Sequence, residues 1–111
     1  QAGGLDKAGE SPAEKEEIVE MAVEQEAAGA FAVVVEHVPP AVGRAVTEAL
    51  EVPTIGIGAG PDTDGQVLVL ADVLGLSTST PPFAAQFGDV RGEMERAVRA
   101  YREAVKDRDF P

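Results

Sequence analysis

Hydrophobic and polar positions in this chain follow a helical period first. Across Pro12–Ala28, apolar side chains recur with the 3.6-residue spacing of a helix, and glutamates occupy most of the other face. Ser11 can cap this helix, proline stands in its first turn, and Glu14 completes a capping box. Gly29 is a typical stop signal. The pattern therefore predicts an amphipathic helix over this range.

Two short apolar runs follow, Phe31–Val38 and Thr54–Gly58. Continuous apolar runs of this length are typical of strands that are buried in a parallel sheet. Between the two runs, the residues after Pro39-Pro40 return to the helical period and predict a second helix. Its apolar stripe consists of Val42, Ala45, Val46, Ala49 and Leu50.

The stretch after the second strand has two interpretations. Val67–Leu70 has the propensity of a strand. However, only a short segment, residues 59–66, would separate it from the preceding strand, whereas a parallel crossover usually takes a dozen or more. We therefore predict a buried helix over Gly65–Val73, with Asp64 as its N-cap, and a short third strand over Leu74–Ser77.

The last part of the chain predicts one long helix. Pro81-Pro82 belongs to a loop, and Phe83–Phe87 is expected to form a single helical turn. Asp89 can cap a final helix that runs to about Lys106. Its apolar stripe consists of Met94, Ala97, Val98, Tyr101 and Ala104 or Val105.

The predicted order is a helix followed by three strand–helix units. Alternating units with short connections indicate an α/β fold with a parallel sheet and right-handed crossovers. Three strands alone would leave apolar edges unpaired. The pattern therefore favours the C-terminal three to four β/α units of a (β/α)₈ TIM barrel, a fold of roughly 250 residues. Residues 1–111 would form this partial barrel domain, and a complete small α/β domain is the alternative.

Charge narrows the choice of partners. The chain carries 20 acidic and 9 basic residues, a formal charge of −11. Such a field repels phosphates, which argues against nucleic acid and anionic membranes as partners. The acidic residues are dispersed and lysines are few, as on the surface of a halophile's protein, where high salt screens the repulsion. An ordinary acidic protein is the alternative.

Other features of the composition point to the cytoplasm. The chain has no cysteine, which excludes disulfides and thiolate chemistry. No apolar run reaches the roughly 18 residues of a membrane span. The sequence starts at Gln1 without a signal-peptide pattern, so we expect either upstream processing or an expression fragment.

Glu36 is the strongest candidate for chemistry. It ends an apolar strand, and the reactive groups of a (β/α) barrel lie at the carboxyl ends of strands. Partial desolvation there would raise its pKa towards the range of a general base. A structural ion pair with a barrel lysine or arginine is an equally good explanation. His37 should point to the opposite side, towards the helices, where a structural role is the better explanation.

The glycines of the second strand are a weaker candidate site. Gly56, Gly58 and Gly60 stand at every second position, so a ligand or another backbone can approach closely. Tight packing within a barrel explains them equally well. Asp62 is most simply a turn residue. The other carboxylates near this strand are Asp62, Asp64 and Asp72. They do not form an evident set of oxygen ligands for a metal ion.

Several motifs resemble one known family. FAVVVEHVP, then AVTEALEVPTIGIGAGPDTDGQVLVLADVLGL, and finally PPFAAQFGDV and YREAVKDRDFP are similar to the C-terminal part of ketopantoate hydroxymethyltransferase. GGLDKAGES resembles the family's loop after the fifth strand more loosely. The combination of V-x-E-x-V-P with IGIGAG-x-x-x-DGQ is specific, and the resemblance extends over essentially the whole chain.

The resemblance implies a (β/α)₈ barrel that transfers a hydroxymethyl group from methylenetetrahydrofolate to the 2-oxo acid 3-methyl-2-oxobutanoate, a step of pantothenate biosynthesis. It implies that Mg²⁺ chelates the keto acid and that Glu36 is the base that removes the C3 proton. The segment Gly56 to Gly60 would line the site. The family also forms large homo-oligomers with its last helix in contacts, so Met94, Tyr101 and Phe110 are expected to face a neighbouring subunit.

The chain also departs from the family. The family's Mg²⁺-binding acids and substrate-binding lysine lie on earlier strands that are not in this sequence, so no metal ligand is expected here. Ala71 replaces a family histidine, and the acidic, histidine-containing tail is missing. Two alternatives therefore stay open: a non-catalytic barrel fragment that needs an N-terminal partner chain, or another 2-oxo-acid lyase or mutase of the same superfamily.

Overall fold

The computed structural model describes residues 8–111. Most of the expected loop Gln1–Glu10, and part of the GGLDKAGES motif, lie outside the described residues. The chain divides into two compact units, one that ends at Val67 and one that begins at Leu68. We describe each unit by itself.

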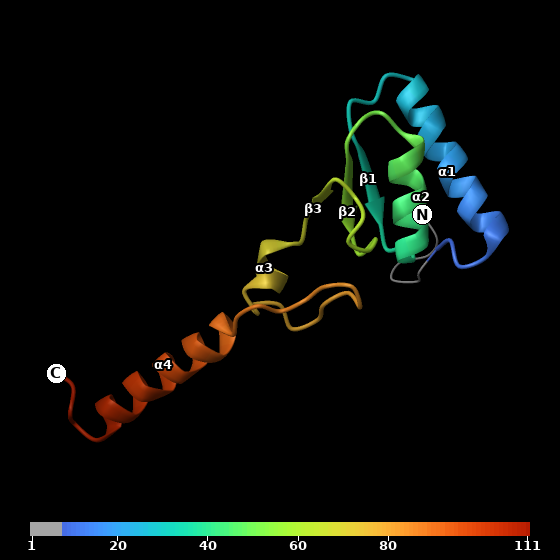
Figure 1. Cartoon of the computed structure of the whole chain (residues 1–111). Coiled ribbons are helices and arrows are strands. Elements are labelled where there is room, and N and C mark those ends of the chain that lie inside the picture. The colour runs from blue at the N-terminus through green and yellow to red at the C-terminus, as the bar shows by residue number, and fades with distance from the viewer. Residues whose placement is uncertain (1–7) are drawn as a thin grey trace. The chain divides into compact units, whose positions relative to one another are not determined.

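The first unit is a three-stranded parallel sheet with two helices on one face (Figure 1). The strand order is β1-β2-β3, and Glu36 at the end of β1 pairs with Ile57 at the end of β2. The elements are α1 (Pro12–Ala27), β1 (Val33–Glu36), α2 (Pro40–Ala49), β2 (Thr54–Ile57) and β3 (Gly65–Gln66). The parallel α/β class and the first two strands were thus correctly predicted.

Helix α1 begins as its sequence predicts. The Ser11 hydroxyl accepts a hydrogen bond from the Glu14 N–H, and the Glu14 carboxylate accepts one from the Ser11 N–H. Near the other end of α1, one carboxylate oxygen of Glu26 accepts from the N–H groups of Glu51 and Val52, at 2.6 and 2.9 Å. Glu26 therefore ties α1 to the turn that leads into β2.

The core of the first unit lies between the sheet and its helices. Val33 and Val35 of β1 point into this core, whereas Val34 and Glu36 point to the other face of the sheet and are exposed. The buried apolar residues are Ala22, Val33, Val35, Val38, Val42, Val46, Leu50 and Ala59. Among the described residues of the first unit, only one face of the sheet is therefore covered.

Helix α2 touches the segment after β2 backbone to backbone. A Cβ atom on Gly43 would lie 2.1 Å from the carbonyl oxygen of Ala59, a separation that real Cβ atoms do not adopt. Glycine at this position of α2 costs helix propensity. In return, the backbone of α2 approaches the Ala59 carbonyl more closely than any residue with a side chain would allow.

The predicted helix over Gly65–Val73 is wrong. Gly65–Gln66 is strand β3, parallel to β2, and only Leu70–Val73 forms a short helix, α3. The seven residues 58–64 make the parallel connection without a helix. Because β2 has four residues and is only about 13 Å long, seven extended residues suffice to run back along it. The usual length of a parallel crossover, a dozen or more residues, argued against a strand here, but it applies to crossovers that contain a helix.

The second unit contains α3 and a long helix, α4 (Val90–Lys106). The predicted strand over Leu74–Ser77 is wrong: this segment does not form a strand, and Gly75 adopts a left-handed φ of 74°. The carbonyl groups of Val73 and Leu74 accept instead from N–H groups at the start of α4 and just before it. The helical turn expected at Phe83–Phe87 is also wrong, since the chain makes a tighter turn that begins at Pro81.

Helix α4 has an apolar face that the second unit does not bury. Asp89 caps it, as predicted, by accepting from the Gly92 N–H. Met94, Val98 and Tyr101 remain 57%, 66% and 59% exposed. Arginine–glutamate pairs lie along the polar face, among them Arg91–Glu95 at 3.1 Å.

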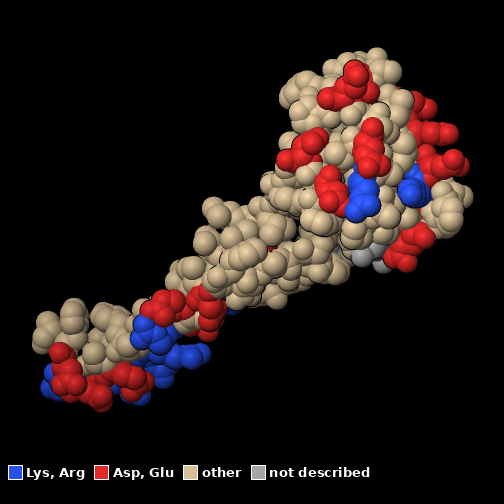
Figure 2. Space-filling model, viewed as in Figure 1, with Lys and Arg blue, Asp and Glu red and all other residues tan. Residues whose placement is uncertain are grey.

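Acidic side chains predominate on the visible face of the first unit, whereas both signs mix on α4 (Figure 2). Of the α1 glutamates, Glu16, Glu17, Glu20 and Glu24 are all exposed. Repulsion among them is unscreened at low salt. In residues 8–111, no helix is both long enough and apolar enough to cross a membrane.

We predict that Gly43→Ala destabilises the chain. The added Cβ would collide with the Ala59 carbonyl, and overpacking of this kind costs about 1–3 kcal/mol. Urea unfolding followed by circular dichroism measures the loss. The matched control is Gly65→Ala, whose Cβ would meet only Ile55, at 3.9 Å. Equal unfolding midpoints for the two variants would contradict the close-contact explanation.

We also predict that molar KCl raises the free energy of unfolding of the chain, because salt screens the repulsion of its −11 charge. Thermal melts by far-UV circular dichroism at low and high KCl test this. A variant with Glu16, Glu20 and Glu24 changed to Gln should need less salt for the same stability. If its salt dependence matches that of the unaltered chain, charge repulsion is not the cause.

Candidate functional site

The candidate site is the edge of the sheet where β1 and β2 both end. The His37 N–H donates to the Ile57 carbonyl at 2.8 Å, and the Val38 N–H donates to the Gly58 carbonyl at 3.1 Å. His37 adopts a left-handed φ of 54°, which is uncommon for a residue with a side chain. These bonds hold the backbone directly after Glu36 against the end of the neighbouring strand.

Glu36 projects from the open face of the sheet and is exposed. His37, which was predicted to point away from the side of Glu36, is buried and only 5% exposed. The partial burial expected for Glu36 is not found, because no other described residue of the first unit covers its face of the sheet. Its neighbours on that face, Val34 and Ile57, are apolar.

Two of the three glycines at the end of β2 and just after it are packed closely by the protein itself. A Cβ on Gly56 would lie 2.6 Å from the Thr63 hydroxyl, and one on Gly60 would lie 2.7 Å from Pro40. Gly58 and Gly60 have left-handed φ values of 68° and 84°. Of the two interpretations of these glycines, the geometry gives Gly56 and Gly60 a clear packing role. All three lie at the end of β2 or just after it.

Asp64 does not cap a helix, contrary to the prediction. Its carboxylate accepts from the Thr54 N–H at 2.8 Å and from the Thr54 hydroxyl at 3.2 Å. Thr54 is fully buried, and its hydroxyl lies 2.8 Å from that of Thr47 on α2. The connection 58–64 is thereby fastened to the start of β2.

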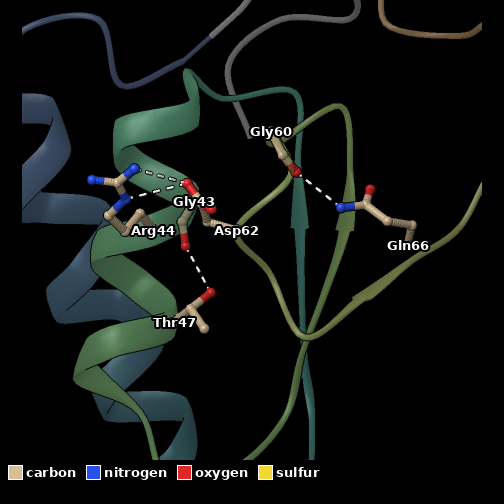
Figure 3. A network of polar contacts seen from close by, with 6 residues as sticks. All are labelled: Gly43, Arg44, Thr47, Gly60, Asp62 and Gln66. Carbon is tan, nitrogen blue, oxygen red and sulfur yellow. Dashed lines mark hydrogen bonds and ion pairs between the residues drawn. The ribbon is translucent and has the colours of Figure 1, made fainter.

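Further polar contacts hold the middle of the same connection (Figure 3). Asp62 lies in a turn, as predicted, and also forms an ion pair with Arg44 of α2 at 3.1 Å. The Gln66 amide donates to the Gly60 carbonyl at 2.9 Å and to the Thr63 hydroxyl at 3.1 Å. Neither Gln66 nor Thr54 was predicted from the sequence, although Gln66 belongs to the DGQ motif, which was the available signal.

The remaining acids do not gather into a metal site. Asp72 is buried within the second unit, on α3. Across residues 8–111, no three histidine, cysteine, aspartate or glutamate side chains lie close enough to hold a metal ion. The described residues therefore do not fit a Mg²⁺ ion by themselves, because such a site needs several converging oxygen ligands.

An apolar groove of about 240 Å³ runs between α1 and β1. Ile18 and Met21 line it from the helix, and Val34 and Glu36 line it from the strand. β2 pairs with β1 on one side only, so the other edge of β1 borders this groove. The groove thus reaches the candidate base.

Comparison with known proteins identifies the family. The family model described as ketopantoate hydroxymethyltransferase matches residues 1–111. A 3-methyl-2-oxobutanoate hydroxymethyltransferase of Haloarcula marismortui is 62% identical over 98 residues, 88% of this chain and 36% of that protein. Relatives of the same name from Halobacterium salinarum (53% identical, 100% of this chain, 40% of the relative) and Synechococcus elongatus (47%, 96% and 40%) also match. The chain spans only 36–42% of the length of the curated relatives it matches. It belongs to the ketopantoate hydroxymethyltransferase family.

Proposed function

We propose that this chain is part of an enzyme that transfers a hydroxymethyl group from methylenetetrahydrofolate to 3-methyl-2-oxobutanoate. The family match over all 111 residues carries this proposal, because it includes the V-x-E-x-V-P segment with Glu36. In a parallel α/β sheet, the carboxyl ends of strands are the usual place for catalysis. Glu36 occupies that place on β1.

In this proposal, Glu36 acts as the general base. Its carboxylate takes the proton from C3 of the keto acid, and the electron pair of the broken C–H bond passes into an enolate. Water releases the one-carbon unit from methylenetetrahydrofolate as formaldehyde and leaves tetrahydrofolate. C3 of the enolate then bonds to the formaldehyde carbon, whose C=O electron pair moves onto its oxygen, and that oxygen takes up a proton to become the new hydroxyl. The apolar neighbours Val34 and Ile57 would flank the reacting carbon and exclude water once that face of the sheet is covered.

We propose that residues 1–111 are the C-terminal portion of a single (β/α)₈ barrel domain. Helix α1 precedes β1 and packs on the same face as α2. With a right-handed crossover, a strand before α1 would lie along the free edge of β1, where the apolar groove is. The greater length of the relatives agrees with additional strands.

The cofactors belong to this larger assembly. Since residues 8–111 do not fit Mg²⁺ by themselves, we propose that its ligands lie outside this chain. We also propose that most contacts to the folate cosubstrate lie outside this chain, whereas Gly56, Gly58 and Gly60 would line the site with backbone alone. A cytoplasmic location is proposed for the enzyme.

The alternative is that these 111 residues are a non-catalytic fragment that needs an N-terminal partner chain. The uncovered face that carries Glu36 and the groove beside β1 favour it over independent activity. The two possibilities differ only in whether the chain alone can assemble a site.

The first test is ketopantoate formation by a chimera in which this chain replaces the segment it matches in the Halobacterium salinarum relative. We expect the chimera to be active with Mg²⁺ and the chain alone to be inactive. Glu36→Gln should lower kcat by about 10²–10⁴-fold, the usual contribution of a general base. The control, Glu48→Gln, removes an exposed carboxylate from α2 and should leave kcat unchanged. Full activity of the Glu36 variant would reject the proposed role.

We further propose that the enzyme is a homo-oligomer in which α4 contacts a second copy. The exposed apolar face of α4, extended by an edge-to-face contact between Tyr101 and Phe110 at 5.5 Å, supports this. Monomeric proteins seldom expose a continuous apolar stripe of this kind.

Analytical ultracentrifugation of the chimera tests the interface. Val98→Glu would place a charge in the apolar stripe, and we expect it to shift the distribution towards smaller species. Ala100→Glu adds the same charge to the same helix about 100° away from Tyr101 and serves as the control. Identical distributions for the two variants would rule out the α4 face as the contact.

A further inference from the structure

One part of the family's glycine motif has no role in the proposed function: the Gln66 side chain. We propose that Gln66 is a positioning residue, which acts through Gly60 to hold the backbone that follows Glu36. This inference rests on the proposed role of Glu36 as the base. Its structural part, however, can be tested without any activity.

The Gln66 side chain contacts two residues of the connection 58–64. Its amide nitrogen donates to the Gly60 carbonyl at 2.9 Å and to the Thr63 hydroxyl at 3.1 Å (Figure 3). Thr63 in turn donates to the Gly65 carbonyl at 2.9 Å. The side-chain amide of Gln66 thus reaches back from β3 and joins Gly60 to Thr63 within the connection 58–64.

Gly60 in turn packs against the start of α2. Gly60 is pressed against Pro40, since a Cβ there would lie 2.7 Å from both Cα and Cβ of the proline. The preceding residue, Ala59, is fully buried, with its carbonyl against Gly43 of α2. Pro40 stands four residues after Glu36. The connection therefore packs directly on the segment that leaves β1.

The residues that follow Glu36 are held from two sides. Residues 37 and 38 donate to the carbonyls of Ile57 and Gly58 on one side, and Pro40 meets Gly60 on the other. His37 holds a left-handed φ of 54°, a conformation that persists only where the surroundings impose it. If the connection loosens, His37 can relax to a commoner conformation, and the adjacent Glu36 carboxylate then changes direction.

A second polar contact in the same connection provides a contrast. The ion pair between Arg44 and Asp62 has side chains that are 64% and 38% exposed. Gln66 is exposed as well, but it donates directly to the Gly60 backbone carbonyl, whereas Arg44 binds only the Asp62 side chain. Exposed ion pairs between side chains contribute little to holding a backbone geometry. Arg44→Met is therefore a matched control for Gln66→Met: both variants remove a side-chain donor to the connection and leave an unbranched apolar side chain.

The structural arm of the test is amide hydrogen exchange by NMR on the 111-residue chain in high salt. In Gln66→Met, we expect the His37 and Val38 amides to exchange about fivefold to tenfold faster, the equivalent of one lost hydrogen bond. The Ala28 amide, bonded to Glu24 at the C-terminal end of α1, does not belong to the connection and should not change. Arg44→Met should leave all three rates as they are. Unchanged His37 and Val38 rates in Gln66→Met would overturn the proposal.

The catalytic arm uses the chimera. Gln66→Met should lower kcat about tenfold to a hundredfold while KM for the keto acid stays the same, as expected when a base is misaligned. A loss that falls on KM alone, or an equal loss in Arg44→Met, would overturn the positioning role. If Gln66→Met fails to fold, Thr63→Val removes the second acceptor with matched volume and must show the same pattern. An active Glu36→Gln chimera would instead reject the proposed function, with the amide-exchange result unaffected.

Discussion

The arrangement of the candidate site depends on two backbone hydrogen bonds, from the N–H groups of His37 and Val38 to the carbonyls of Ile57 and Gly58. They continue the parallel pairing of β1 and β2 beyond the last residue of β1. Glu36 is therefore the final residue of a paired strand, and its backbone is restrained on both sides. Without these bonds, the carboxylate would sit at the beginning of a loop, where its direction would not be defined.

The glycines make this pairing possible by allowing close approach. Gly56 makes room for Thr63, Gly60 for Pro40 and Gly43 for the Ala59 carbonyl. Each contact brings the connection 58–64 against the strands or against α2. A motif that at first suggests a ligand-binding surface is thus also a packing device, and the two roles are compatible because the packed glycines surround the ends of the strands.

The sequence predicted the elements whose signals are local. The capping box at Ser11 and the cap at Asp89 located α1 and α4, and the apolar runs located β1 and β2. Glu36 was found because it ends a strand. The same reasoning failed for Gly65–Val73, because β3 has only two residues and is defined by pairing with β2 rather than by its own pattern.

The role of Asp64 shows why such errors arise. An aspartate before an apolar stretch is a good N-cap by its local sequence, yet here it binds Thr54, ten residues earlier. Likewise, Gln66 finds its acceptor on Gly60, and only the fold brings the two together.

The open face that carries Glu36 raises the related question of what completes the site. In relatives more than twice as long, the additional residues can cover it.

The most direct test of the account is proton exchange at C3 of 3-methyl-2-oxobutanoate in D₂O, followed by NMR with no folate cosubstrate present. This measurement isolates proton removal from hydroxymethyl transfer. If Glu36 is the base, the chimera with Mg²⁺ will exchange the C3 proton, and the rate will fall to background when Glu36 is replaced by Gln. Exchange that persists in the variant at the original rate would mean that another group removes the proton, and the central claim would be wrong.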